Sequence, residues 1–503
     1  MYVGDHLARR CLYGPDDPAL IDVTGEDPVR LTYRDLNRQA DQTANWLRER
    51  GVEMGDRVAF VGYAGVAPLR MFFACSKIGA AFTPLNWRLH PAEIGDLLTR
   101  TTPALLVHDV EEPMASIAGH VRDAGVGPPP VPLDEALAEW ETAPDAPAAE
   151  ESATEETIAC LLFTGGTTGV PKAAEISHRH IVWNTFNALL ADVLPTDTYL
   201  NIFPLFHSGG LFAFSVPLLI MGGTVIQPRS FDADQALRLI ESEGVTVFAG
   251  VPTVFQMLTQ ADSWEEADLS GLRYCLSGGA PMPVPLIERY AADKGVVFRQ
   301  GFGMTEFGPD VFSLSSQDSV RKAGSIGRPN FFVDAKVVHP ETGVSLPPGG
   351  VGELLLRGPG SMSGYFGDPE ATAAAFEADG WFHTGDLARF DDEGYCFIVD
   401  RLKDMFVSGG ENVFPAEVEA AIHEVPGVAM TAVVGVPDDR WGEVGAAFVV
   451  PAPGHEIDEQ AVLDHLRTRL AKYKIPRLVR IVDDLPVSGA GKILKTELKE
   501  LVR

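Results

Sequence analysis

Short apolar runs alternate with amphipathic helical stretches along most of the chain. A helical pattern over residues 31–50, with its apolar side chains on one face, is followed by the apolar run Val58–Val61. The alternation returns between residues 158 and 297, for example in Thr224–Ile226 and the helical stretch Asp232–Ser242. Apolar residues three and four positions apart indicate a helix packed on one side, and the short runs between such helices indicate buried parallel strands. We therefore expect an α/β protein built on parallel sheets.

The pattern changes in three regions. Residues 125–157 are rich in Pro, Ala and Glu, which predicts a solvated loop or weakly packed linker. After about Gly324, short β-like runs between glycines and prolines predict a small antiparallel barrel or sheet. The last hundred or so residues alternate again, and Pro415 suits the first position of a helix.

Charge and cysteine content exclude some classes of protein. The formal net charge of the 503 residues is −30, and such a surface repels nucleic-acid phosphates. Any ATP bound here needs glycine loops and a few local cations to offset this charge. Five scattered cysteines without a Cys-x-x-Cys pair favour a reducing cytoplasm. The N-terminus lacks the apolar core of a signal peptide, and the most apolar stretch, Leu211–Met221, is too short to span a bilayer.

The segment Leu161–Ala174 carries the strongest local motif. An apolar run enters a loop of three glycines and three threonines, which ends at Lys172. Glycines let backbone N–H groups converge on phosphate oxygens, and the hydroxyls and the ammonium add donors. The loop does not fit the Walker pattern, because neither Gly165 nor Gly166 has a glycine five positions on. Taken alone, a flexible surface loop is an equally good interpretation.

Three further motifs follow. Gly301–Glu306 combines two glycines and an aromatic ring, suited to a planar base, with a carboxylate suited to Mg²⁺. Trp381–Asp386 ends in a carboxylate that could hold ribose hydroxyls, although a capped turn is the commoner structure of Thr-Gly-Asp. Leu485–Lys495 holds Lys492 beside glycines, where a solvated surface charge is the ordinary interpretation.

In this order and spacing, the four motifs resemble those of the adenylate-forming superfamily of acyl-CoA synthetases, luciferases and peptide-synthetase adenylation domains. The resemblance extends from about residue 18 to residue 503. It implies a large N-terminal domain, residues 1–400, which contains two α/β sheet subdomains plus a small β-barrel and holds ATP and the acid. It also implies a smaller, mobile α+β C-terminal domain, residues 401–503, with its hinge at Lys403.

The resemblance also implies the residues of the nucleotide site. Those expected to bind ATP are Thr164, Gly165, Gly166, Thr167, Thr168, Gly169, Lys172, Gly278, Gly279, Ala280, Gly301, Phe302, Gly303, Met304, Thr305, Asp386 and Arg401. Glu306 and Thr164 are expected to bind Mg²⁺. The residues expected to be catalytic are Lys492, Glu306, Thr305 and His207. Lys492 would bridge the substrate carboxylate and the α-phosphate, two anions whose repulsion an ammonium and Mg²⁺ offset.

Two further groups of residues follow from the same resemblance. Those expected to contact CoA are Ser408, Gly409, Gly410, Trp441 and Lys474, with the two glycines leaving room for a thin thiol arm. Those expected to line the acyl pocket are Trp183, His207, Phe248, Gly279, Gly303 and Pro309. The glycines leave space for an aliphatic tail or a flat ring. A fatty acid and an aryl or arylpropenoic acid are both open, with a fatty acid slightly ahead as the commoner substrate class.

Three functions remain open. The first is a cytoplasmic acyl-CoA synthetase of fatty acid metabolism, which converts a carboxylic acid, ATP and CoA into acyl-CoA, AMP and diphosphate through an acyl adenylate. The second is a ligase that loads the acid onto a carrier protein, although the insertion typical of such ligases is not obvious between Glu306 and Arg401. The third is a non-catalytic nucleotide-binding homologue. It rests on Gly165, where serine is common in the family, and Ala173, where glycine is common. Small molecules are the expected partners, and a homodimer stays open.

Overall fold

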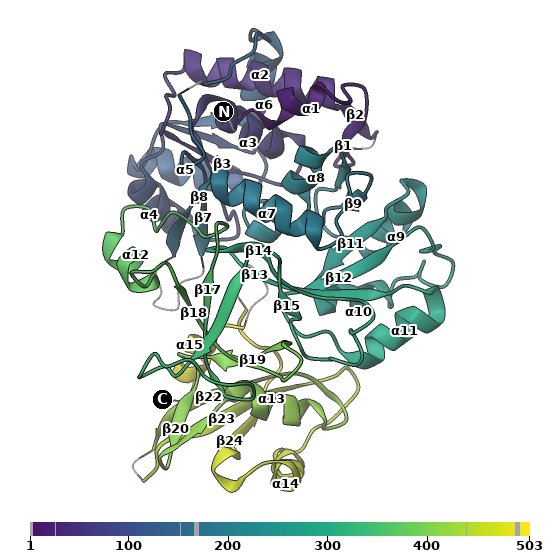
Figure 1. Cartoon of the computed structure of the whole chain (residues 1–503), viewed down its shortest axis with the longest axis vertical. Helices are drawn as coiled ribbons and strands as arrows, with labels where there is room; N and C mark the ends of the chain where they lie inside the picture. The colour runs from purple at the N-terminus through teal and green to yellow at the C-terminus, as the bar shows by residue number, and fades with distance from the viewer. Residues whose placement is uncertain are drawn as a thin grey trace. The chain divides into compact units, whose positions relative to one another are not determined.

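The computed structural model describes residues 4–25, 27–150, 152–164, 171–438, 440–487 and 493–502. The chain, traced in Figure 1, divides into two compact units. The first unit comprises Met1–Asp334 and Leu356–Phe382, and the second comprises Ala335–Leu355 and His383–Arg503. A division by compactness does not locate a hinge, so the domain boundary at residues 400 and 401 and the hinge at Lys403 stay predictions.

The first unit contains two sheets, as the alternating pattern predicts. In order across the larger sheet, the strands are β15 (Arg328–Pro329), β14 (Gly308–Leu314), β13 (Phe298–Met304), β12 (Tyr274–Gly278), β11 (Val247–Gly250), β9 (Thr198–Leu200), β10 (Thr224–Gln227), β1 (Pro18–Asp22) and β2 (Val29–Thr32). The six strands from β13 to β1 run parallel, and β2, β14 and β15 are antiparallel to their neighbours.

The strands of the smaller sheet are, in order, β6 (Pro130–Pro132), β5 (Leu105–His108), β3 (Arg57–Val61), β4 (Ala81–Leu85), β7 (Ile158–Thr164) and β8 (Lys172–Ser177). All of its pairs are parallel except β7 with β8. Parallel strands that are buried on both faces consist of continuous apolar runs, so their positions can be predicted from the sequence.

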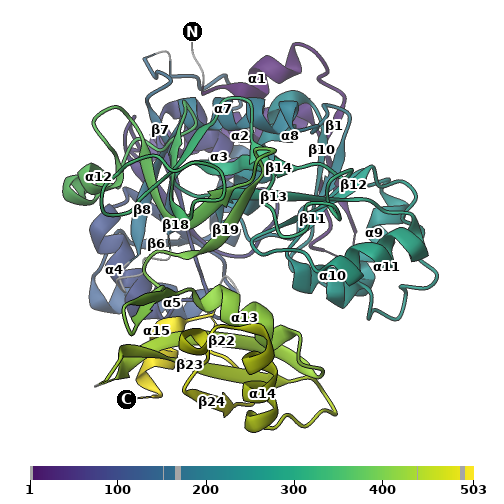
Figure 2. The same cartoon turned by 60° about the horizontal axis from the view of Figure 1, so that its bottom comes forward.

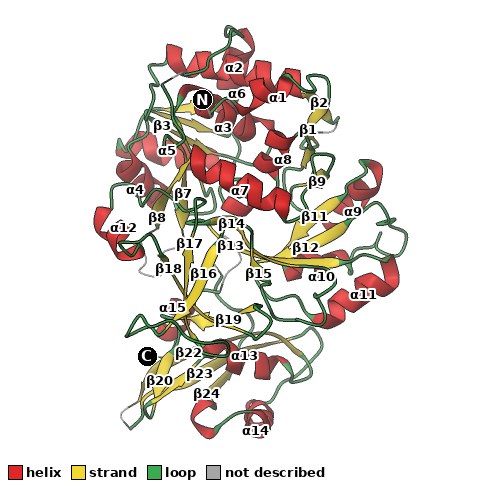
Figure 3. Cartoon of the chain, in the orientation of Figure 1, coloured by secondary structure: helices red, strands yellow, loops and turns green. Residues whose placement is uncertain are grey.

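Helices accompany these sheets (Figure 3). They are α1 (His6–Cys11), α2 (Tyr33–Glu49), α3 (Val66–Ile78), α4 (Pro91–Thr101), α5 (Met114–Ala124), α6 (Leu133–Thr142), α7 (His178–Leu190), the π-helix η1 (Gly209–Ala213), α8 (Ser215–Met221), α9 (Ala233–Ser242), α10 (Pro252–Leu258), α11 (Val284–Lys294) and α12 (Pro369–Ala375). Helix α2 begins with a capping box between Thr32 and Asp35, and its apolar face is fully buried, as its periodicity predicts.

The predicted linker over residues 125–157 is wrong for its central part, which forms helix α6. The Trp140 side chain of α6 is fully buried and meets the ring of Trp46 edge-on, with 5.6 Å between the ring centroids. Ala136, one turn earlier, is also fully buried. These two residues give α6 an apolar stripe that the high content of Ala, Glu and Pro conceals.

The second unit contains most of a four-stranded sheet and a separate five-stranded sheet. The first has, in order, β16 (Asp334–Val338), β17 (Gly352–Arg357), β18 (Phe382–Phe390) and β19 (Cys396–Arg401). The second has β21 (Glu411–Val413), β20 (Phe406–Ser408), β23 (Gly442–Pro451) and β22 (Val428–Asp438), and β24 (Leu478–Ile481) also pairs with β23. The helical elements here are α13 (Pro415–His423), α14 (Glu459–Arg469), the 3₁₀ turn η2 (Lys472–Lys474) and α15 (Lys495–Glu500).

Two apolar clusters hold the five-stranded sheet between these helices. One contains buried side chains of α13 and α14, including Val418 and Leu466, with Val433 of the sheet. The other contains Leu498 of α15 with Val434, whose side chain points to the opposite face. Helices α13 and α14 therefore cover one face and α15 the other (Figure 2). In the part of the chain that the structure describes, no helix combines the length and apolarity needed to span a membrane.

Candidate active site

The two ends of the predicted phosphate loop meet in the hairpin of β7 and β8. Thr164, the last residue of β7, pairs with Lys172, the first residue of β8. The Thr164 hydroxyl donates a hydrogen bond of 3.4 Å to the Lys172 carbonyl. The loop residues Gly165, Gly166, Thr167, Thr168 and Gly169 lie outside the described residues. The hairpin thus brings one threonine and the lysine of the predicted ATP site together.

Glu306 lies in the turn that joins β13 to β14. Its backbone carbonyl accepts a hydrogen bond of 2.8 Å from Met362 N, and Phe307 N closes the turn onto Met304 O at 3.2 Å. The carboxylate accepts a hydrogen bond of 3.1 Å at Oε1 from the Tyr365 hydroxyl. Both the backbone and the side chain of this glutamate are therefore held by residues 362–365.

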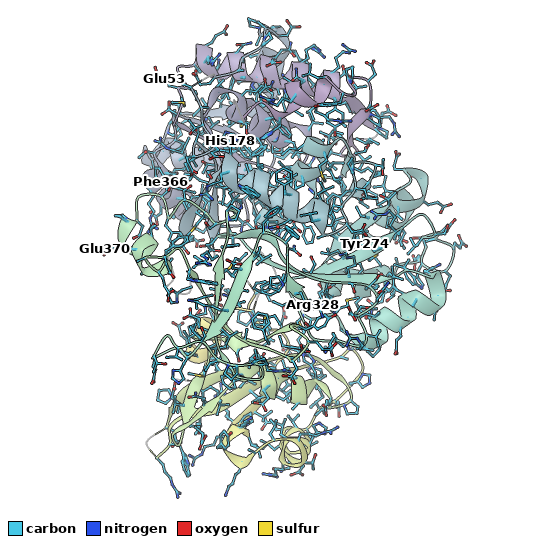
Figure 4. The ribbon with its side chains drawn as sticks, in the orientation of Figure 1. Glu53, His178, Tyr274, Arg328, Phe366 and Glu370 are labelled. Carbon is cyan, nitrogen blue, oxygen red and sulfur yellow. The ribbon has the colours of Figure 1, made fainter. Side chains whose placement is uncertain are left out.

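Tyr365 also contacts Lys172, which no sequence motif indicated. The Lys172 ammonium lies over the tyrosine ring, with Nζ 4.9 Å from its centroid. Burial and the charge of Glu306 raise the pKa of the Tyr365 hydroxyl above its ordinary value, so it stays a donor. Figure 4 labels the next residue, Phe366, and Glu370 at the start of α12. One tyrosine thus contacts both the predicted phosphate-binding lysine and the predicted metal-binding glutamate.

Mg²⁺ bound with ATP is usually held by one or two carboxylates together with phosphate oxygens. The described residues contain no group of three or more His, Cys, Asp and Glu side chains arranged to hold a metal. Glu306 supplies one carboxylate, and within the described part of the chain its Oε2 accepts no hydrogen bond, whereas Oε1 accepts the one from Tyr365. This donor set fits a magnesium ion that arrives with ATP.

The predicted adenine-side residues lie at the carboxyl ends of two neighbouring parallel strands. Gly278 at the end of β12 pairs with Gly301 of β13. Gly279 follows with φ at +79°, a conformation that favours glycine. Phe302 pairs with Phe312 across the β13–β14 hairpin, with 5.9 Å between ring centroids. Ligands of α/β sheets bind at the carboxyl ends of the strands, which is consistent with these positions.

Ala280 and Gly303 are exposed, and Met304 pairs with Gly308 at the end of the same hairpin. Most of the residues predicted to lie beside the adenine are thus on neighbouring strands of the larger sheet, in the first unit.

Several predicted acyl-pocket residues lie near this hairpin. A β-carbon on Gly303 would come within 2.2 Å of the Pro309 carbonyl oxygen, so these two residues are in direct contact. The Thr305 hydroxyl lies 3.5 Å from the hydroxyl of Ser208, the neighbour of His207. Trp183, on α7, packs edge-on against a neighbouring phenylalanine ring, with 4.8 Å between centroids.

Phe248 lies on β11, at neither end of that strand. Its side chain is fully buried in the apolar core and meets Phe255 edge-on, with 5.8 Å between ring centroids. Because residues on both faces of β11 are buried, the apolar character of this strand does not distinguish a pocket wall from a core. Phe248 is therefore part of the apolar core, and its place in the acyl pocket stays a prediction.

The predicted ribose-binding residues form an ion pair in the second unit. Asp386 is 2% exposed, and its Oδ1 lies 2.7 Å from Arg401 Nε. The Thr-Gly-Asp segment is part of strand β18, with Gly385 at a φ of +67°, and not a capped turn. The Thr384 hydroxyl donates to Leu354 O at 2.6 Å and accepts from Asp386 N at 3.0 Å, which fixes the aspartate backbone.

Most of the residues predicted to contact CoA belong to the β20–β21 hairpin or contact it. Gly409 and Gly410 form the turn between β20 and β21, both with positive φ, and Ser408 is buried before them. Gly409 N donates a hydrogen bond of 2.8 Å to Trp441 O. Lys474 of η2 instead forms an ion pair with Glu417, with Nζ 2.7 Å from both carboxylate oxygens.

Lys492 lies outside the described residues, but both sides of its segment are described. Val487 and Ile493 form an antiparallel bridge. Leu494 N donates a hydrogen bond of 2.8 Å to Pro486 O. The chain on either side of the predicted catalytic lysine is therefore paired.

Comparison with known proteins accords with this arrangement. Residues 7–366 match the model of the AMP-binding enzyme family, and residues 417–492 match that of the AMP-binding enzyme C-terminal domain. A feruloyl-CoA synthase from an Amycolatopsis species is 45% identical over 473 residues, 93% of each chain. A long-chain-fatty-acid–CoA ligase from Mycobacterium tuberculosis is 37% identical over 506 residues, 99% of this chain and 98% of the relative.

Among solved structures, ATP-bound MatB from Rhodopseudomonas palustris superposes with a TM-score of 0.90 at 33% identity, covering 99% of this chain and 98% of that one. The fold and site thus define an adenylate-forming ligase. The chain belongs to the AMP-binding enzyme family, and within it to the AMP-forming acyl-CoA synthetases.

Proposed function

We propose that this synthetase activates an aromatic carboxylic acid with MgATP and transfers the acyl group to CoA. The observation that carries the proposal is the pair of contacts made by Tyr365, to Lys172 at 4.9 Å and to Glu306 at 3.1 Å. MgATP needs a cation for its phosphates and a carboxylate for its metal at neighbouring positions. In a chain with a net charge of −30, such a local arrangement helps to offset the repulsion between the protein and ATP.

In the first half-reaction, a carboxylate oxygen of the acid attacks the α-phosphorus and diphosphate leaves. Lys172 and the loop that it closes hold the phosphates, and Asp386 holds the ribose hydroxyls. Lys492 approaches the attacking carboxylate and the α-phosphate, where an ammonium stabilises the charge that develops. Magnesium, when bound at Glu306, neutralises phosphate charge and helps diphosphate to leave.

In the second half-reaction, the CoA thiol attacks the acyl carbonyl carbon, and the bond between that carbon and the phosphate oxygen of AMP breaks. Gly409 and Gly410 leave the space that a pantetheine arm needs, because neither carries a side chain. The thioester and AMP are then released. The C-terminal domain rotates about Lys403 between the two steps in this proposal.

The identities of the relatives favour an aromatic acid over a fatty acid. The feruloyl-CoA synthase is 45% identical, whereas the long-chain-fatty-acid–CoA ligase is 37% identical. Gly279 and Gly303 are compatible with a flat ring, and Trp183 offers an aromatic surface. We propose an arylpropenoic acid as the substrate class.

We also propose that the reaction takes place in the cytoplasm, which supplies ATP and CoA and keeps the five cysteines reduced.

The test is a panel of carboxylic acids assayed with MgATP and CoA, with the products identified by mass spectrometry. Ferulic, cinnamic and benzoic acids are compared with short and long fatty acids. We expect an arylpropenoyl-CoA as the main product, with kcat/KM at least about tenfold above that for any fatty acid. A fatty acid as the best substrate would contradict the proposed substrate class. Acyl transfer to a phosphopantetheine-bearing carrier protein but not to CoA would contradict the proposed acceptor.

A further inference from the structure

Tyr365 is fixed in place by backbone pairing to β8. Ala174 and Tyr365 form an antiparallel bridge, and Phe366 N donates a hydrogen bond of 2.8 Å to Ala173 O. Side chains alternate along a strand, so Lys172 and Ala174 share one face of β8. Tyr365, opposite Ala174, is therefore the diagonal neighbour of Lys172 on that face. This register explains why the tyrosine ring meets the lysine ammonium.

Contacts on the other side of Tyr365 fix the same segment. Tyr365 N donates a hydrogen bond of 2.9 Å to the Thr372 hydroxyl. Met362 N donates one of 2.8 Å to Glu306 O. A β-carbon on Gly364 would lie only 3.0 Å from Thr372, so the chain has little room for a side chain there. The tyrosine hydroxyl is thereby held at the Glu306 carboxylate.

We propose that Tyr365 is a positioning residue for MgATP: its hydroxyl orients the Glu306 carboxylate toward the metal, and its ring holds the Lys172 ammonium beside the phosphates. The inference rests on the proposed function of Glu306 and Lys172. A carboxylate with one oxygen bound to a hydroxyl keeps one orientation for its other oxygen, and residues that orient metal ligands in this way typically change metal affinity 10- to 100-fold. A cation over an aromatic ring adds a smaller contribution.

The two contacts can be separated by substitution. Tyr365→Phe keeps the ring under Lys172 and removes only the hydrogen bond to Glu306. Tyr365→Leu removes both contacts. Tyr274→Phe is the matched control, because the Tyr274 hydroxyl donates a hydrogen bond to Asp192 O at the opposite end of β12 from Gly278. Figure 4 labels this tyrosine.

The experiment is calorimetric titration of each full-length variant with ATP, without acid or CoA, from EDTA to saturating Mg²⁺. We expect Tyr365→Phe to raise the Mg²⁺ concentration for half-maximal ATP affinity about tenfold and to leave ATP affinity in EDTA unchanged. Tyr365→Leu should also weaken ATP binding in EDTA, and Tyr274→Phe should change neither quantity. The inference would be overturned if the ATP affinity of Tyr365→Phe and that of the wild type depended on Mg²⁺ in the same way. It would also be overturned if Tyr365→Phe lost as much ATP affinity in EDTA as in saturating Mg²⁺.

Glu306→Gln separates this inference from its premise. If Glu306→Gln raises the Mg²⁺ requirement and Tyr365→Phe does not, the inference about Tyr365 is wrong and the proposed metal site stands. If Glu306→Gln leaves the Mg²⁺ requirement unchanged, the proposed metal site is wrong and the inference is overturned with it. Should Tyr365→Leu fail to fold, the comparison of Tyr365→Phe with the wild type still decides the question.

Discussion

The indole ring of Trp441 lies against Gly409, so that a β-carbon on this glycine would come within 2.8 Å of the ring. The neighbouring Gly410 has nothing within 4 Å of the same position. Their φ angles are similar, +62° and +88°, so an added side chain strains the backbone at both positions. The two glycines therefore differ mainly in their contact with Trp441, which makes them a matched pair for the CoA step.

We predict that Gly409→Ala displaces Trp441 and lowers the rate of acyl-CoA formation from supplied acyl adenylate on the order of 10²-fold, as misplacement of a reacting group does. Gly410→Ala should also lower this rate, because it fills space proposed for the pantetheine arm, but by less, since its methyl group displaces no side chain. Both variants should retain acid-dependent pyrophosphate exchange into ATP. Single-turnover assays of each half-reaction measure this difference. Similar losses in both variants would rule out the contact with Trp441 as the cause.

Lys492→Ala is predicted to have the opposite effect. Loss of the ammonium should lower the adenylation rate on the order of 10²- to 10³-fold, because it leaves the charge in the transition state without a donor. The variant should still convert supplied acyl adenylate to thioester. Lys499→Ala, in α15, is the control and should retain both steps. A Lys492→Ala enzyme that loses both half-reactions equally would contradict the assignment of separate residues to the two steps.

Asp386→Asn is predicted to raise the KM for ATP about 10- to 100-fold and to change kcat little, because hydrogen bonds from ribose hydroxyls to a charged carboxylate are lost in the ground state and the transition state alike. Asp334→Asn is the control, because its pair with Arg357 is exposed and contributes little. Steady-state kinetics at varied ATP provides the measurement. A fall in kcat at unchanged KM would indicate that Asp386 acts in the chemical step instead.

Buried histidines predict sensitivity to acid. His178, labelled in Figure 4, begins α7 with its ring centroid 6.0 Å from that of His6. Burial, and secondarily the charge of His6, lowers the pKa of His178 to about 3. Burial lowers the pKa of His6 to about 4 and that of His180 to about 3. Below about pH 6.5 the unfolded chain takes up protons that the native state does not, so the free energy of unfolding falls as the pH falls.

Urea unfolding at pH 7.5 and pH 5.0 tests this for His178. One such histidine contributes about 1.4 kcal/mol per pH unit between its unfolded and folded pKa values. The wild type should therefore lose about 2 kcal/mol more than His178→Gln between these two pH values. Comparing the two proteins cancels the contribution of other titrating groups. Equal losses would show that His178 is not kept neutral by the fold.

Periodic and apolar patterns predict the sheets of the first unit, because strands buried on both faces appear in the sequence as continuous apolar runs. Helix α6 is harder to recognise in the sequence, because only Ala136 and Trp140 form its buried apolar stripe. Phe248 lies on a strand buried on both faces, and the sequence of such a strand gives no sign of which side faces the substrate.

The candidate site rests on motifs that resemble those of a known family, and the ligand contacts expected of its residues stay predictions. The motifs could not indicate Tyr365, whose position depends on the register of residues 363–366 along β8 and on a turn far away in the sequence at Glu306. Nor could they show that Gly409 and Trp441 touch, since that contact follows from the pairing of Ser408 with Gly442 across the sheet.

The most direct test of the account is isotope exchange between labelled diphosphate and ATP without CoA. If an acyl adenylate forms before the thiol reacts, exchange will require the acid and Mg²⁺ but not CoA, and adding CoA will then yield acyl-CoA and AMP. Exchange that appears only after CoA is added, or turnover that releases ADP and phosphate, would contradict the account.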